Sequence, residues 1–280
     1  KQEWLKIKNS NLLVTQEEIK TIKKFFKLPN LKEKEFKLKS NNSELKVWID
    51  QNVKKHKIKG YSIVFISLKP LGLPPGDITS KQMRTVAKIS KKYSFGEIRV
   101  THEQNLVLPH VLNSNLEIIW KLLKEEGLST SNIGLLTDTI CCPGLDYCAL
   151  ATARSIPIAQ RISNHFSTIE KQKIIGDMKI KISGCINACG HHHVGNIGIL
   201  GLDRNGQEFY QITMGGSSDE NSQIGEIIGP SFPTEKIIDA LDKILEVYLK
   251  KRRNSKENFL QTVKQIGLKP FKEALYENNK

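Results

Sequence analysis

All five cysteines of this 280-residue chain lie between positions 141 and 189, in two short clusters. The first is Cys141-Cys142-Pro143-Gly144-Leu145-Asp146-Tyr147-Cys148, and the second is Gly184-Cys185-Ile186-Asn187-Ala188-Cys189-Gly190. Counted from Cys142, the two pairs are spaced C-x5-C and C-x3-C, with 36 residues between them. Thiolates are the soft ligands that hold iron–sulfur clusters, and nearby Gly and Pro let backbone approach a bulky inorganic group. The spacing therefore favours an iron–sulfur cluster.

Two other uses of these thiols stay open from spacing alone. Structural zinc sites pair cysteines about two to four residues apart, which C-x5-C exceeds. A free cysteine is often a small buried hydrophobe, and we interpret Cys141 in this way, with an alternate ligand as the other possibility. The odd number of cysteines and the lack of a secretory signal in residues 1–15 argue against a disulfide framework.

The elements ahead of the first cysteine cluster alternate between strand and helix. Apolar, β-branched runs predict strands over 61–68, 97–101 and 105–109, and helical periodicity predicts helices over 79–93 and 115–125. This order predicts a small α+β sandwich with its helices on one face of the sheet.

The elements around and after the cysteines indicate a second domain. We expect a helix around 149–166, strands over 179–183, 197–202 and 208–213, and a helix over 234–250, followed by a basic tail with one more possible helix. At the other end, a capping box at Thr15 predicts a lysine-rich helix that ends near Leu28. Residues 45–55 fit a helix or an extended segment equally. The predicted organisation is a basic extension or linker over 1–45, a first domain over 46–130 and a second over 131–280.

The net charge of +14 is concentrated at the two ends of the chain. Residues 1–60 hold 16 Lys against 7 acidic residues, and residues 250–280 hold 9 Lys and Arg against 3. Without stacking aromatics or a helix-turn-helix signature, this excess argues against nucleic-acid binding and favours docking of an acidic protein partner. No apolar run reaches the length of a membrane span, so we expect a cytoplasmic protein with no membrane role. The chain begins at Lys1 rather than Met, and we therefore expect a processed product or a piece of a longer chain.

Two further motifs invite specific interpretations. Consecutive residues cannot all face one point, so we expect one of His191, His192 and His193 near a cofactor and the others in solvent or in structural hydrogen bonds. The glycines in Gly195-Asn196-Ile197-Gly198-Ile199-Leu200-Gly201 do not match the dinucleotide-binding spacing, and we expect them to let strand and turn backbone pack closely against a cofactor.

The two cysteine clusters resemble those of the siroheme and 4Fe-4S nitrite/sulfite reductase family. Two more segments match in order, Thr101-His102-Glu103-Gln104-Asn105-Leu106-Val107-Leu108-Pro109-His110 upstream and the glycine motif downstream. The likeness covers residue 46 to the end and is greatest to the second half of sulfite reductase hemoproteins. It implies a ferredoxin-like α/β sandwich domain followed by a mixed α+β domain that binds the cluster and siroheme.

The resemblance also implies roles for single residues. Cys142, Cys148, Cys185 and Cys189 would bind the cluster, Cys189 would bridge it to the siroheme iron, and Asn187 stands at the family's Asn. Arg99 and Arg154 are candidates to meet siroheme carboxylates or else are surface salt-bridge residues, and Gln104 and Asn105 are candidates to lie near the macrocycle.

The resemblance implies the six-electron reduction of sulfite to sulfide in sulfur assimilation, with a ferredoxin or a flavoprotein subunit as electron donor. Reduction of nitrite to ammonia is the alternative, and an incomplete 4Fe-4S electron-transfer fragment is the second. Family members are usually twice this length, and their first half supplies the Arg and Lys that grip the anion, so no catalytic residue is assigned here. This chain has Glu103 where a first-half copy has an anion-binding Arg, and Ile186 where the family has Pro.

Overall fold

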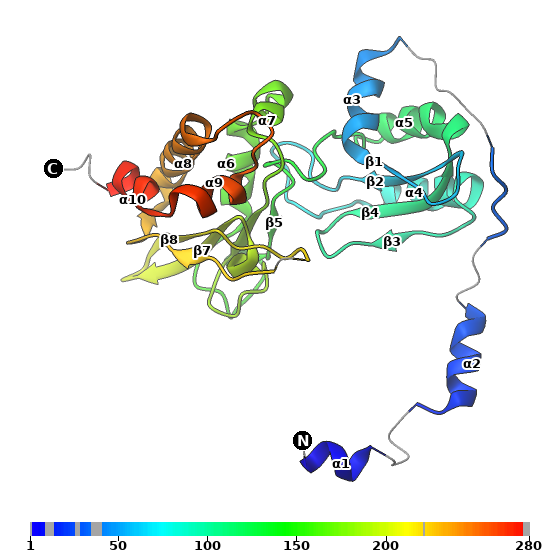
Figure 1. Cartoon of the computed structure of the whole chain (residues 1–280), viewed down its shortest axis with the longest axis horizontal. Helices are drawn as coiled ribbons and strands as arrows, with labels where there is room; N and C mark the ends of the chain where they lie inside the picture. The colour runs from blue at the N-terminus through cyan, green and yellow to red at the C-terminus, as the bar shows by residue number, and fades with distance from the viewer. Residues whose placement is uncertain (1, 9–13, 26–28, 35–40, 221, 277–280) are drawn as a thin grey trace.

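The computed structural model of the chain describes residues 2–8, 14–25, 29–34, 41–220 and 222–276. Two lobes lie side by side, and helices α1 (Gln2–Ile7) and α2 (Gln16–Phe25) extend away from both (Figure 1). Neither helix buries a residue. The predicted capping box is present, because the Thr15 N–H donates to the Glu18 carboxylate (2.7 Å) and the Glu18 N–H donates to the Thr15 hydroxyl (3.2 Å). Residues 26–28 of the predicted helix lie outside the described residues.

The first lobe is a four-stranded antiparallel sheet with the strand order β1-β2-β4-β3. Its elements along the chain are α3 (Ser43–Asn52), β1 (Val53–Lys55), β2 (Tyr61–Ile66), α4 (Ser80–Tyr93), β3 (Arg99–Val100), β4 (Leu106–Leu112) and α5 (Leu116–Glu125). The α+β sandwich expected from the sequence is confirmed, and the segment that the sequence left unassigned forms α3 and β1.

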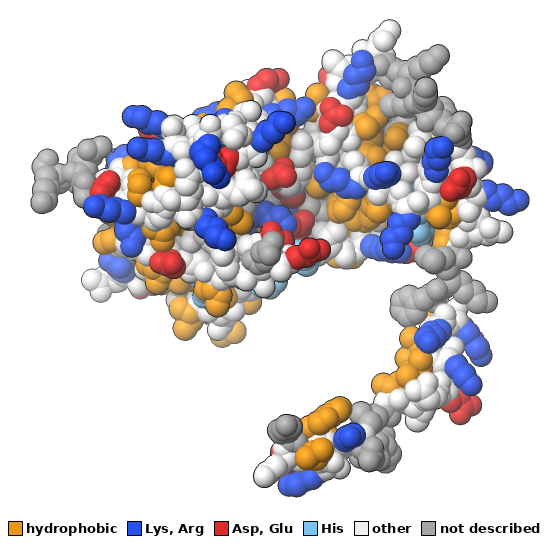
Figure 2. Space-filling model, viewed as in Figure 1, with side chains coloured by type: hydrophobic (Ala, Val, Ile, Leu, Met, Phe, Trp, Pro, Cys, Tyr) orange, Lys and Arg blue, Asp and Glu red, His pale blue; other side chains and the backbone are white. Residues whose placement is uncertain are grey.

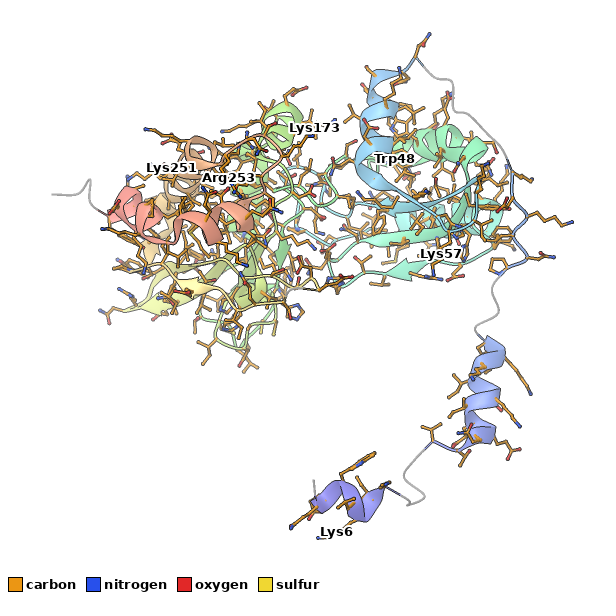
Figure 3. The ribbon with its side chains drawn as sticks, in the orientation of Figure 1. Lys6, Trp48, Lys57, Lys173, Lys251 and Arg253 are labelled. Carbon is orange, nitrogen blue, oxygen red and sulfur yellow. The ribbon has the colours of Figure 1, made fainter. Side chains whose placement is uncertain are left out.

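One hydrophobic cluster joins the three helices of this lobe to one side of its sheet. From α3 it takes Leu45 and Trp48, both 0% exposed, and Trp48 lies between this helix and the rest of the lobe (Figure 3). Val64 of β2 and Leu108 of β4 are register partners, so their side chains share the covered face. These three helices do not cover the other face of the sheet. On that face Leu31 lines a cavity together with Ile63 and Val107.

The second lobe is built on a six-stranded mixed sheet with the main order β10-β8-β7-β6-β5, in which β9 pairs with β8. Strands β5, β6 and β7 run parallel, and the other pairings are antiparallel. The elements are β5 (Ile140–Cys141), α6 (Ile156–His165), α7 (Ile169–Ile175), β6 (Ile180–Ser183), β7 (Ile197–Arg204), β8 (Gln207–Met214), β9 (Glu226–Ile227), β10 (Phe232–Pro233), α8 (Ile237–Lys251), α9 (Phe259–Ile266) and α10 (Lys269–Tyr276).

The helix predicted over 149–166 is shorter in the structure, because α6 begins only at Ile156. The backbone N–H groups of Thr152 and Ala153 both donate to the Gly184 carbonyl, at 2.9 and 3.0 Å. Residues whose N–H groups are used in this way cannot join a helix ladder, and Pro157 suits the first turn of the helix that follows.

The C-terminal segment forms two helices where the sequence predicted one at most. Phe259 of α9 and Phe271 of α10 are both fully buried and belong to the hydrophobic cluster of the second lobe. Arg253, labelled in Figure 3, pairs with the buried carboxylate of Glu257 at 2.9 Å just before α9. The basic side chains of the C-terminal segment therefore lie on or next to helices that pack into the hydrophobic cluster of the second lobe.

The described helices include none with the length and apolar character needed to span a bilayer.

We expect Leu45→Ala to lower the free energy of unfolding by about 2 to 5 kcal/mol, because it removes buried methyl groups from a packed cluster. Urea unfolding followed by circular dichroism measures the change. The matched control is Lys46→Ala, an exposed position on the same helix, which should stay within roughly 0.5 kcal/mol of wild type. Equal effects of the two substitutions would mean that α3 does not pack on the first lobe.

Candidate metal centre

The first cysteine loop begins where β5 ends. The Cys142 N–H donates to the Ile182 carbonyl of β6 at 3.1 Å, which continues the parallel pairing by one residue. The Cys142 Sγ accepts a hydrogen bond from the Gly184 N–H at 3.1 Å and lies 3.4 Å from the Ser155 Oγ. The Cys142 sulfur therefore lies beside the second cysteine loop, next to Gly184, which directly precedes Cys185.

The second cysteine loop is a tight turn that follows β6. The Ala188 N–H donates to the Cys185 carbonyl at 3.2 Å, and Ala188 has a φ of 57°. The Gly190 N–H then donates to the Ser183 hydroxyl at 3.2 Å, which folds the loop back onto the end of the strand. Cys185 and Cys189 thus sit at the two ends of one compact turn.

The two loops are in direct backbone contact at Gly144 and Gly184. A Cβ added to Gly184 would lie 2.5 Å from the Ala153 carbonyl oxygen and 2.9 Å from the Gly144 Cα. The Cys148 N–H donates to the Gly144 carbonyl at 2.9 Å, so Cys148 is tied to the same junction. Only residues without side chains fit there, so these glycines allow the two loops to meet.

The four thiols differ in exposure: Cys142 and Cys185 are buried, Cys148 is half-buried and Cys189 is exposed. Large apolar side chains around them are open to solvent, including Tyr147 at 82% and Ile186 at 80%. A cavity of about 380 Å³ next to Cys142 lies between the two lobes, with Tyr147 on one side and Val100 of β3 on the other. The site is therefore sheltered at its base and apolar at its open side.

The proposed donor set consists of four thiols, which are the soft ligands that iron–sulfur clusters use. Among the residues that the structure describes, no three His, Cys, Asp or Glu side chains surround a point where one metal ion would be held. In a 4Fe-4S cube each thiolate binds a different iron, so the sulfurs stand farther apart than four ligands around one zinc ion. The structure carries the four thiols on two joined loops, and binding of a cluster by them stays a prediction.

Cys141 has a different environment from its neighbour. Its side chain is 3% exposed and belongs to the hydrophobic cluster of the second lobe. Burial raises the pKa of the Cys141 thiol to about 12, with a further contribution from Cys142. Iron binds the thiolate, and a raised pKa makes the Cys141 thiol harder to deprotonate than an ordinary cysteine. This position agrees with the interpretation of Cys141 as a small buried hydrophobe.

Asn187 and the two predicted arginines lie on the surface. Asn187 is exposed on the turn between Cys185 and Cys189. The Arg154 Nε lies 3.6 Å from the Asp146 carboxylate, next to the first loop. Arg99 donates to Glu97 at 2.6 Å and lines the cavity of about 660 Å³ on the open face of the first sheet, away from the cysteines. The structure thus brings Asn187 and Arg154 to the cysteine loops, but not Arg99, and contact with siroheme stays a prediction for all three.

Gln104 and Asn105 lie where the two lobes meet. The Gln104 amide donates to the Cys141 carbonyl at 2.8 Å and accepts from the Cys141 N–H at 3.2 Å. The Asn105 side chain is 1% exposed, accepts from the Leu68 N–H (3.1 Å) and donates to Asp138 (3.0 Å). Both amides therefore bond to protein groups, and contact with a macrocycle stays a prediction.

The three consecutive histidines differ in exposure, although the His192 and His193 rings lie only 3.9 Å apart, centroid to centroid. His192 is buried, and His191 and His193 are exposed. Burial, together with the neighbouring His193, lowers the pKa of His192 to about 4, so His192 is neutral at physiological pH. In the glycine motif beyond them, Gly198 packs against protein backbone, because a Cβ on it would lie 2.0 Å from the His192 carbonyl oxygen, and packing against a cofactor stays a prediction.

A group of charged side chains between the lobes was not predicted from the sequence. Lys69 and Asp138 form an ion pair of 2.6 Å with side chains only 2% and 4% exposed. Lys179 binds Glu103 at 2.5 Å; burial raises the pKa of this carboxylate, but the bond and charge of Lys179 outweigh it and hold the pKa below its ordinary value. These partners are about 70 residues apart in the chain, so no local pattern pairs them.

Two family models match this chain. The model described as "Nitrite and sulphite reductase 4Fe-4S domain" covers residues 134–280, which include both cysteine loops. The model described as "Nitrite/Sulfite reductase ferredoxin-like half domain" covers residues 69–126.

Curated relatives include reductases of both anions. The chloroplastic ferredoxin–nitrite reductase of Spinacia oleracea is 28% identical over 190 residues, which cover 64% of this chain and 31% of that protein. The sulfite reductase (NADPH) hemoprotein beta-component of Bacillus pumilus is also 28% identical over 190 residues, covering 66% and 32%. The chain thus spans about a third of the length of these relatives.

Solved structures share the fold. The NirA protein of Mycobacterium tuberculosis matches with a TM-score of 0.64 at 22% identity, over 79% of this chain and 41% of that one. Dissimilatory sulfite reductase I (DsrI) matches with a TM-score of 0.64 at 11% identity, over 77% and 69%. The mixed α+β architecture predicted from the sequence is confirmed by these neighbours. Because the 4Fe-4S domain model covers more than half of its length, the chain belongs to the nitrite and sulfite reductase family, whose cofactors are a 4Fe-4S cluster and siroheme.

Proposed function

We propose that this chain holds a 4Fe-4S cluster through Cys142, Cys148, Cys185 and Cys189 and serves in the six-electron reduction of sulfite to sulfide. The observation that carries the proposal is the direct bonding of the two cysteine loops, in which the Gly184 N–H donates to the Cys142 sulfur. Segments separated by 36 residues are thereby held at one junction, as ligands of a shared group must be.

When bound, the cluster and siroheme supply electron storage and an iron site for the anion. The protein's part is to hold the ligands and tune them. A backbone N–H directed at a ligand sulfur stabilises the thiolate, and such bonds are among the factors that set the potential of a cluster. Cys189 is the exposed thiol of the four, which suits the residue that also reaches siroheme.

The choice of sulfite follows from the likeness of the motifs to the second half of sulfite reductase hemoproteins. Nitrite is the second candidate, because the spinach relative is a nitrite reductase and is equally similar. The cysteine ligands serve both anions alike, so the difference between them must come from side chains around the anion rather than from the cluster.

For the electron donor we propose an acidic protein, either a ferredoxin or a flavoprotein subunit, acting in the cytoplasm. The net charge of +14 supports steering of such a donor through the summed field of the chain. Figure 2 shows Lys and Arg side chains spread over both lobes, with Asp and Glu among them, rather than gathered in one patch on this face. We therefore expect the charge of the whole chain, rather than a single patch, to attract the donor. This attraction should weaken as ionic strength rises.

Cys185→Ser should lose most bound iron, whereas Cys141→Ser should keep it, because only the first removes a proposed ligand. Both positions are buried, so the second variant controls for disturbance of the core. Iron and acid-labile sulfide assays on anaerobically purified protein, with an absorption spectrum, measure the outcome; wild type should hold about four cluster irons per chain and one more in siroheme. Iron loss in Cys141→Ser with retention in Cys142→Ser would show that the ligand register is wrong. Four iron without siroheme bands in wild type would favour an electron-transfer fragment.

Steady-state rates with reduced methyl viologen should be higher with sulfite than with nitrite at equal saturation. The same preparation assayed on both anions removes differences in cofactor content. A strong preference for nitrite would replace sulfite with nitrite as the substrate while leaving the cluster assignment intact.

A further inference from the structure

The strand that leads into the first cysteine loop lies at the edge of its sheet. β5 pairs with β6 on one side only, and the Cys142 N–H points toward β6, where it meets the Ile182 carbonyl. The Cys141 N–H and carbonyl point the other way, out of the sheet edge. An edge strand whose backbone groups lack partners is weakly held, and buried groups of this kind need a partner.

The side chain of Gln104, from the other lobe, supplies both missing partners. Its Nε2 donates to the Cys141 carbonyl (2.8 Å) and its Oε1 accepts from the Cys141 N–H (3.2 Å). This two-point contact copies what a neighbouring strand would offer. The residue that it holds comes directly before Cys142, the first proposed thiolate.

Gln104 is itself fixed by an unusual backbone conformation. Its φ of 57° lies in the left-handed region, which non-glycine residues rarely adopt and which costs free energy. The turn around it is closed by a bond from the Thr101 N–H to the Asn105 carbonyl (2.9 Å) and by one from the Asn105 N–H to the Thr101 hydroxyl (3.0 Å). A strained residue retained in a well-bonded turn indicates that its direction matters.

A second anchor from the same turn holds the chain just before β5. Asp138, two residues ahead of the strand, accepts from the Lys69 ammonium (2.6 Å) and from the Asn105 amide (3.0 Å). The Lys69 ammonium also donates to the Glu103 carbonyl. Side chains of the first lobe therefore hold the chain at Asp138, just before β5, and at Cys141 within it. None of these side chains is a thiol.

We propose that Gln104 is a positioning residue for the first cysteine loop, so that retention of the cluster depends on a side chain of the first lobe. The expected effect on cluster retention rests on the proposed cluster at Cys142. The contact between Gln104 and Cys141 does not depend on that proposal, because both residues belong to the protein. Because Gln104 already holds the strand in place, binding of the cluster has to order less of the chain, which lowers the entropic cost of binding.

The test compares Gln104→Ala with Gln160→Ala. Gln160 makes a similar contact between the lobes, an Nε2 bond of 3.0 Å to the Gly72 carbonyl, but away from the cysteines. Gln104→Gly is the second variant, because it relieves the left-handed strain while still removing the amide. The full chain, purified anaerobically, is measured by amide hydrogen exchange of peptides spanning 139–144 and by the rate of iron release to an excess of ferrous chelator.

We expect both Gln104 variants to exchange about tenfold faster than wild type over 139–144 and to release iron about tenfold faster, with Gln160→Ala unchanged in both. Exchange and iron release in the Gln104 variants that match those of Gln160→Ala would overturn the proposal. If wild-type protein holds no iron, the proposed function fails, and the exchange of 139–144 still decides whether Gln104 positions the loop.

Discussion

The contact between Gly144 and Gly184 is the constraint on which the rest of the site depends. It brings together two loops from different parts of the chain, and a Cβ at Gly184 would clash with the Ala153 carbonyl oxygen at 2.5 Å and with the Gly144 Cα at 2.9 Å. The Gly184 carbonyl then accepts from Thr152 and Ala153, and its N–H donates to the Cys142 sulfur. A single residue, Gly184, thus both orients a proposed ligand and keeps Thr152 and Ala153 out of α6. The parallel pairing of β5 with β6 extends this arrangement into the core.

The two lobes divide the work unequally. Every proposed thiolate comes from the second lobe, while the first offers groups that bind backbone or balance charge at the junction. Burying the Lys69–Asp138 pair costs desolvation of both charges, which is tolerated only when further hydrogen bonds complete the pair. Asn105 and the Gly134 N–H supply those bonds to Asp138, at 3.0 and 2.9 Å. Such a network adds little to stability but fixes one relative placement of the lobes, which a site built at their boundary needs.

Sequence patterns predicted the parts of the fold that local interactions determine. The helix expected over 79–93 appears as Ser80–Tyr93, capped by Thr79, and the one over 234–250 as Ile237–Lys251, because periodicity and caps act within a few residues. The predicted start of α6 was wrong because the N–H groups just before this helix donate to the carbonyl of Gly184, some 30 residues away. The cysteines were evident from spacing and family likeness. Gln104 was singled out for another role, since nothing local shows that a side chain will pair with an edge strand.

The graded exposure of the thiols gives the site a direction. Cys142 and Cys185 lie at the base, where protein groups already surround them, and Cys189 lies at the opening beside the exposed Ile186. Apolar side chains that stay open to water at such a rim are stabilised when a flat, apolar group covers them. The chain's own packing thus closes the side of the site that faces the core and leaves the other side suited to a macrocycle. A cluster bound by the four proposed ligands would be shielded from solvent on the side of Cys142 and Cys185, and Cys189, the proposed bridge to siroheme, lies on the exposed side.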